Sequence, residues 1–267
     1  MIWVLAEKEV IEKKDETTSG CIDYNEYTMS NTEKLMYSIV AVVSVFIVAY
    51  IFYHSFVLAL LLSPIGLFYP AIRKKEIIKK RKNELTLQFK DMLFSLSSSL
   101  SAGKSVEMAF RNVLSDLSIV YPDPDTYILR ETEYIIRKIS MNETVEEALS
   151  DFSDRAHLED IDDFVDVFRT CKRTGGNLID VIRNTSNIIN DKIMIGEEIN
   201  TILSEKKFEQ KVLNVIPILM VLFLTLSADD YMEPLFNSII GRLAMTASIG
   251  LLIIAYFVSK KITDIKI

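Results

Sequence analysis

The sequence predicts an all-α integral membrane protein in which four transmembrane helices, arranged as two hairpins, flank a cytoplasmic bundle of about six helices. Two observations lead to this fold class. Four long apolar stretches lie in two pairs, one pair toward each end of the 267-residue chain. The roughly 140 residues between the pairs are mostly polar, and their apolar side chains recur three and four positions apart, as they do on amphipathic helices.

The composition agrees with a protein that lies partly in lipid and partly in water. Hydrophobic residues make up 49% of the chain and charged residues 25%. The hydrophobic fraction is too high for an ordinary soluble domain, and the charged fraction is too high for a chain buried wholly in a bilayer. Cys21 and Cys171 are too far apart in the sequence to suggest a disulfide framework or a zinc site. We therefore expect the polar part to lie in the reducing cytoplasm.

The first hairpin is preceded by an acidic segment that does not have the pattern of a secretory signal. Span one extends from Leu35 to Tyr53 without a charge, and span two extends from Phe56 to Ile72 and contains Pro64. As a single helix the two spans would be about 55 Å long, whereas the hydrocarbon core is about 30 Å thick. We therefore expect the chain to turn back near His54.

The second hairpin is expected over residues 212–258. Span three extends from Val212 to Ala228, with Pro217 near its start, and span four extends from Ser238 to Val258. Small residues of span four allow a second helix to approach closely, which makes association with a second copy or a paralogue a hypothesis. These residues are Gly241, Ala244, Ala247, Ser248 and Gly250.

Basic residues next to the spans indicate the orientation. Seven basic side chains and one acid follow span two, and basic residues next to spans favour the cytoplasmic side. More lysines precede span three and follow span four, whereas the loop between these spans carries acids. The seven are Arg73, Lys74, Lys75, Lys79, Lys80, Arg81 and Lys82. Because no aromatic residues are interleaved, contact with anionic membrane lipid explains them better than nucleic acid does.

The sequence thus divides into six parts. They are the acidic N-terminal segment (1–34), the first hairpin (35–72), a basic juxtamembrane linker (73–83), the helical central domain (84–211), the second hairpin (212–258) and a short cytoplasmic tail (259–267).

Two turns in the central domain share one pattern. A helix stops at Gly103 and the next begins at Ser105; a later helix stops at Gly175 and Gly176, and Asn177 caps its successor. Glycine adopts the left-handed conformation that ends a helix, and Ser or Asn accepts from the free amides of the next one. The segment around Gly103 and the segment around Gly175 align with a constant shift in residue number. This alignment reflects either two similar helical hairpins or merely two ordinary helix turns.

The remaining helix boundaries follow from turn residues. Asp123 or Asp125 is expected to cap the third helix, and Asn142 or Thr144 the fourth. The fifth helix is expected over Leu158 to Cys171, and the sixth continues toward Lys207.

The central domain is acidic, with 23 Asp and Glu against 12 Lys and Arg over residues 84–205. The densest stretch lies on a helix whose apolar residues share the opposite face. Its outward residues are Glu159, Asp160, Asp162, Asp163 and Asp166. They form either a solvated helix face or a docking surface for a basic cytoplasmic partner. A calcium site is disfavoured because the stretch lacks the glycine of a calcium-binding loop.

No residues suggest catalysis, a metal site or a cofactor, so we do not expect an enzyme. Gly103-Lys104-Ser105 looks like the end of a phosphate-binding loop, but Ser98 stands where the first glycine belongs, and the preceding segment has a helical pattern. No carboxylate accompanies a nucleophile and a base. The spans lack the acidic, lysine or histidine clusters that a pump or carrier would need.

Several segments together resemble the type II secretion system F domain family, in the short form found in tight-adherence (Flp-type) pilus systems. The resemblance covers roughly residues 35–260. The matching pieces are the span pair closing on Phe68-Tyr69-Pro70 with its basic run, the segment from Phe89 to Ala109, the segment from Thr174 to Ile182, and the lysine-rich helix entering a span at Ile216-Pro217. The acidic N-terminal segment does not match the family pattern.

This resemblance implies a non-enzymatic inner-membrane platform protein. Such a platform works with a cytoplasmic hexameric ATPase, passes movement to pilin-like subunits, and associates with itself or a paralogous platform protein. A membrane-anchored signalling or scaffold protein with a helical cytoplasmic domain is the alternative. A sensor would need more chain outside the membrane than the short loop between spans three and four provides.

Overall fold

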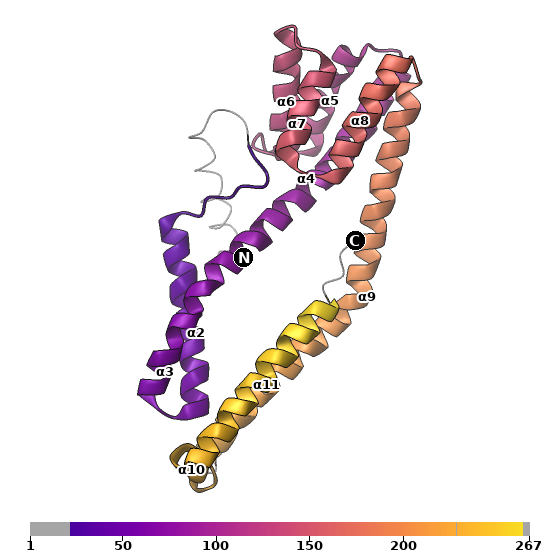
Figure 1. Cartoon of the computed structure of the whole chain (residues 1–267). Helices are drawn as coiled ribbons and strands as arrows, with labels where there is room; N and C mark the ends of the chain where they lie inside the picture. The colour runs from indigo at the N-terminus through magenta and orange to yellow at the C-terminus, as the bar shows by residue number, and fades with distance from the viewer. Residues whose placement is uncertain (1–21, 228, 264–267) are drawn as a thin grey trace. The chain divides into compact units, whose positions relative to one another are not determined.

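The computed structural model describes residues 22–227 and 229–263 (Figure 1). Cys21, most of the acidic N-terminal segment and Lys266 of the tail lie outside the described residues. Among those residues the chain is mostly helical and contains no strand, which confirms the prediction of an all-α fold. It forms two compact units. Within the described residues, the bundle unit comprises 22–28 and 75–193, and the span unit comprises 29–74, 194–227 and 229–263.

The first hairpin of the span unit turns where the sequence predicts. Helix α2 (Asn31–Tyr53) ends at His54, whose backbone is left-handed with φ of 46°, and α3 (Phe56–Leu62) follows directly. The 3₁₀ helix η1 (Ser63–Phe68), which has proline at its start, continues the second span into α4 (Tyr69–Ser101). The basic residues 73–82 therefore lie within a continuous helix.

Gly66 lies at a close approach between the two spans of this hairpin. A Cβ atom placed on Gly66 would lie 2.6 Å from the backbone nitrogen of Val42, a residue of α2. Only a residue without a side chain lets η1 and α2 pack at this distance.

In the second hairpin, span three and a helix of the bundle unit form one continuous helix. Helix α9 (Leu178–Ser227) includes both the predicted sixth helix and span three, and it contains Pro217. The loop between the spans is itself helical, as α10 (Asp229–Asn237), and α11 (Ile239–Thr263) forms span four. The Arg242 Nε donates to the carbonyl of Phe236 at 2.9 Å, so this basic side chain satisfies the C-terminal end of α10.

Four helical segments are long and apolar enough to cross a membrane. At most 17% of the apolar window of any of them is buried inside the chain. The remaining apolar surface is not covered by any described residue, which is the state expected of helices that are solvated by lipid. The prediction of four membrane-spanning helices is confirmed by their length and composition.

Besides Phe110, the core of the bundle unit contains four phenylalanines whose rings contact one another. They belong to α4, α7 (Val145–Ala156) and α8 (Glu159–Thr174), and all four are fully buried. The Phe89 ring lies 5.5 Å from that of Phe164 and 6.0 Å from that of Phe152, and Phe164 and Phe168 are 5.7 Å apart. Such contacts join the helices more specifically than aliphatic packing does. Helices α5 (Val106–Val120) and α6 (Tyr127–Ser140) and the start of α9 complete the core.

The predicted cap of the third helix was wrong. Neither Asp123 nor Asp125 is the N-cap of α6, because the helix begins after Thr126. Asp123 instead accepts from the amide of Asp125 at 3.1 Å within the preceding turn. The buried amide of Ile128 donates to Gln88 Oε1 at 3.1 Å. A side chain of α4 thus caps α6 across the core, which local sequence reasoning does not reveal.

Replacing Gly66 by alanine should destabilise the span unit by about 1–3 kcal/mol, because the new methyl group would overlap the α2 backbone. We expect a lower thermal unfolding midpoint for the detergent-solubilised protein. The matched control is Gly250→Ala in α11, where a Cβ atom meets nothing within 4 Å. Equal thermal unfolding midpoints for Gly66→Ala and Gly250→Ala would contradict the close approach of η1 to α2.

Candidate functional site

Two glycine turns of the bundle unit have the same construction. Gly103 follows α4 with φ of 79°, and Gly175 follows α8 with φ of 71°; both values lie in the left-handed region that favours glycine. The Ser105 hydroxyl accepts from the amide of Met108 at 3.3 Å, and Asn177 Oδ1 accepts from that of Ile179 at 3.1 Å. Each turn thus ends one helix and satisfies an amide at the start of the next.

Gly176 has a different environment from its neighbour Gly175. A Cβ atom here would lie 2.8 Å from the Sγ atom of buried Cys171, whereas one on Gly103 or Gly175 would meet nothing within 4 Å. The amide of Gly176 also donates to the carbonyl of Cys171 at 2.9 Å. Gly176 therefore serves close packing against α8, while the other two glycines serve backbone conformation.

The five acids predicted to form a docking surface have different roles. Asp160 accepts from Lys192 of α9 at 2.5 Å, and Asp162 accepts from the Ser153 hydroxyl of α7. Both contacts hold α8 against its neighbours, and the first raises the pKa of Lys192. Glu159, Asp163 and Asp166 are exposed and make no ion pair or side-chain hydrogen bond within the described part of the chain. These three are available to a partner.

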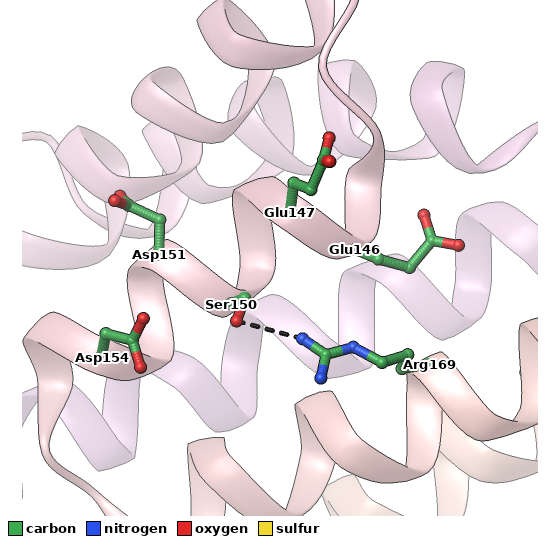
Figure 2. A pocket seen from close by; sticks show the side chains of 6 residues that line it. All are labelled: Glu146, Glu147, Ser150, Asp151, Asp154 and Arg169. Carbon is green, nitrogen blue, oxygen red and sulfur yellow. Dashed lines mark hydrogen bonds between the residues drawn. The ribbon is translucent and has the colours of Figure 1, made fainter.

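A groove between α7 and α8 extends this acidic surface. Its walls carry four carboxylates of α7, and Arg169 of α8 reaches across it to donate to the Ser150 hydroxyl at 3.0 Å (Figure 2). The carboxylates are those of Glu146, Glu147, Asp151 and Asp154. An adjoining hollow adds His157, Asp162 and Asp166. The sequence analysis missed the α7 residues, although their recurrence three and four positions apart places them on one helix face.

Only part of the negative charge in the groove is neutralised within the chain. Lys172 donates to Glu146 at 2.6 Å, and Asp151 pairs with Arg155 at 3.1 Å and Lys138 at 3.5 Å. Asp154 is exposed and has no such partner among the described residues. The groove is therefore lined mainly by acids but contains fixed cations that hold its two walls together.

Local hydrogen bonds keep two of these acids ionised. Burial alone would raise the pKa of Glu146, but hydrogen bonds from Lys172 and from the backbone lower it overall. Hydrogen bonds from the backbone and side chain of Thr144 lower the pKa of Glu147, which is part of the capping box at the start of α7. The groove therefore keeps its negative charge at neutral pH. Among the described residues, no group of three or more His, Cys, Asp and Glu is arranged to hold a metal ion.

The basic residues of α4 do not form one uniform group. Lys74, Lys75 and Lys80 are exposed. Arg81 is only 4% exposed and lies over the Tyr27 ring at 4.7 Å, and Lys82 donates to Asn25 and to the carbonyl of His157. The sequence analysis assigned only topology to Arg81 and Lys82. In the structure these two residues also hold the N-terminal segment against the bundle.

Comparison with known proteins gives one family. Residues 92–226 match the model of the family described as type II secretion system (T2SS), protein F. The match starts within α4, includes both glycine turns and the acidic groove, and ends within the apolar part of α9. No curated protein and no solved structure matches this chain significantly.

Substituting Gly175 by alanine should destabilise the bundle by about 1–2 kcal/mol, because the left-handed backbone is unfavourable for a residue with a Cβ atom. Gly175→Asn should lose less stability than Gly175→Ala, since asparagine adopts the left-handed conformation more readily than alanine does. Denaturant unfolding of the purified protein measures both. A larger loss for asparagine than for alanine would contradict the conformational explanation.

Proposed function

Since the chain belongs to the type II secretion system protein F family, we propose that it is the platform protein of a tight-adherence (Flp-type) pilus assembly machine. In this role it couples a cytoplasmic ATPase to the insertion of pilin subunits or the assembly of the filament. The observation that carries the proposal is the family match over residues 92–226, which includes the whole acidic groove.

Family membership establishes the general class. Proteins of this family are non-catalytic membrane platforms of type II secretion and type IV pilus machinery, and they work with secretion ATPases and pilins. Together with the four helices that are able to span a membrane, membership indicates a multi-pass protein of the inner membrane. The type of filament, the orientation and the docking surface belong to the proposal.

Charge supports a cytoplasmic location for the bundle unit. Lys74, Lys75 and Lys80 are exposed on α4 directly after the second span. Lysines at the end of a span favour the cytoplasmic side and interact with anionic lipid headgroups there. An ATPase that hydrolyses cytoplasmic ATP can contact the bundle only if the bundle lies on this side.

We assign ATPase docking to the groove between α7 and α8 together with the exposed acids of α8. Asp154, Asp163 and Asp166 are exposed and make no ion pair or side-chain hydrogen bond in the described chain, although the charge of Asp163 acts on Lys192. A basic protein surface can therefore pair with them without breaking an internal hydrogen bond. Complementary charge of this kind accelerates association and selects the partner. At an exposed surface its effect decreases as the salt concentration rises.

Reversing two of these charges should weaken the complex with the ATPase. In the Asp163→Lys/Asp166→Lys variant we expect less ATPase to co-purify, with at least a tenfold weaker affinity at low salt, or about 1.4 kcal/mol. The difference from the unaltered protein should shrink at high salt. Pull-down with the purified ATPase across a salt series measures both effects.

The matched control is Asp125→Lys/Glu133→Lys, which makes the same change in net charge at exposed acids outside the groove. This variant should bind like the unaltered protein. If both double variants lose binding equally, only net charge matters and the groove is not the docking surface. If neither loses binding, the acids of α8 form only a solvated face.

Cells from which this chain is deleted should lack surface filaments, while their pilin subunits remain in the membrane. Electron microscopy and immunoblotting of membrane fractions provide the measurement. Restoring the chain from a plasmid should restore the filaments. Normal filaments in the deletion strain would reject the platform role and favour a scaffold or signalling function.

A further inference from the structure

An N-terminal segment outside the family match packs on the bundle. Residues 22–28 belong to the bundle unit, and Ile22 and Tyr24 are part of its hydrophobic core. Ile22, Tyr24 and Tyr27 are buried, while Asp23, Asn25 and Glu26 are exposed. This segment, which we call the strap, turns at Tyr24 and Asn25 and leads into α2 (Figure 1, indigo). Its three buried side chains lie against the helices, and its polar side chains face outward.

Tyr24 is the central contact of the strap. Its side chain is completely buried, and its ring lies edge-on to that of Tyr127 at 5.6 Å. Its hydroxyl donates to Glu131 of α6 at 3.0 Å, and its amide donates to the carbonyl of Arg155 in α7 at 3.0 Å. The strap thus joins two helices through one residue, with both side-chain and backbone hydrogen bonds.

The strap also completes a buried ion pair. The two terminal guanidinium nitrogens of Arg155, Nη1 and Nη2, donate to the two oxygens of Glu131 at 2.8 and 2.7 Å, and Glu131 is only 3% exposed. A buried ion pair is unfavourable unless further hydrogen bonds satisfy its members. Tyr24 supplies a donor to Glu131, and the carbonyl of Ile22 accepts from Arg155 at 3.3 Å. Burial and the charge of Glu131 raise the pKa of Tyr24, so its hydroxyl stays protonated as a donor.

Contacts with α4 and the end of α7 hold the other edge of the strap. Arg81 lies over the Tyr27 ring at 4.7 Å, and Lys82 donates to Asn25 at 3.0 Å. His157 Nε2 lies 3.4 Å from the carboxylate of Asp23. The strap therefore contacts α4, α6 and α7, the helices that carry the bundle core and one wall of the acidic groove.

We propose that residues 22–28 are a strap that ties the bundle unit directly to the first membrane span. Only Met29 and Ser30 separate the strap from α2. The bundle then has a third connection to the spans, beside α4 and α9, because the strap is covalently continuous with α2 and is held to the bundle by non-covalent contacts. Because the strap contacts the bundle, it lies on the same side of the membrane as the bundle, and the chain crosses the membrane an even number of times between them.

The strap has a mechanical consequence that rests on the proposed function. A partner that moves α7 while bound in the acidic groove pulls on Arg155, which holds Ile22 and Tyr24. That movement reaches span one through two intervening residues. Release of the strap leaves the bundle connected to the membrane only through α4 and α9.

Hydrogen exchange of the full-length protein in detergent, followed by mass spectrometry, tests the docking of the strap. Peptides that cover residues 22–28 should be protected, because the Tyr24 amide is hydrogen-bonded in a buried position. Tyr24→Ala should raise their exchange rate at least about tenfold, while peptides from α5 keep their protection. Tyr24→Phe retains the ring and should produce a smaller increase.

The matched control is Tyr121→Phe. The Tyr121 hydroxyl also donates to a carboxylate, that of Asp91 at 2.6 Å, but this contact lies outside the strap. Strap exchange in Tyr121→Phe should equal that of the unaltered protein. Fast exchange of residues 22–28 in the unaltered protein, or unchanged exchange in Tyr24→Ala, would overturn the proposal. Loss of protection throughout the bundle in Tyr24→Ala would show that the strap is not separable and would overturn it too.

Filament assembly in cells tests the mechanical role separately. If the strap transmits movement, Tyr24→Ala should reach normal membrane levels and yet assemble fewer filaments than Tyr121→Phe. Normal filament numbers with a released strap would overturn this role and leave docking intact. Normal filaments in the deletion strain would instead reject the proposed function, and the exchange result would remain valid.

Discussion

The need to satisfy backbone hydrogen bonds in two solvents determines this architecture. An α-helix pairs its own amides and carbonyls, so it can pass from lipid into water without interruption. Helix α9 does this over 50 residues, about 75 Å, with an apolar part that is exposed and an N-terminal part that packs into the bundle core. In the opposite chain direction, α3 and η1 form most of span two, and α4 continues from that span into the bundle core.

The bundle between these helices combines local and long-range interactions. Its glycine turns depend on backbone conformation and short hydrogen bonds that neighbouring residues supply. Other polar contacts join residues far apart in the sequence, such as Gln88 with Ile128 and Arg155 with Glu131. A buried amide or carboxylate without a partner costs about 1–3 kcal/mol or more, so these contacts select one packing among several that the apolar pattern permits.

The candidate site shows how far sequence reasoning extends. Helical spacing correctly placed the acids of α8 away from the core, because periodicity depends only on the geometry of one helix. It did not distinguish Asp160, which pairs with Lys192, from Asp166, which makes no ion pair or side-chain hydrogen bond among the described residues. It also missed the acids of α7, because only tertiary packing sets α7 and α8 side by side to form a groove.

The sequence by itself determined the helical class, the four apolar segments, the hairpin turn at His54 and the positions of Gly103 and Gly175. Each follows from hydropathy, periodicity or the conformational preference of one residue. Only the tertiary structure decided that Gln88 caps α6, that Gly66 and Gly176 are needed for close packing, and that the strap completes the pair of Arg155 and Glu131. These features depend on residues that are distant in the chain and become neighbours only when the helices pack.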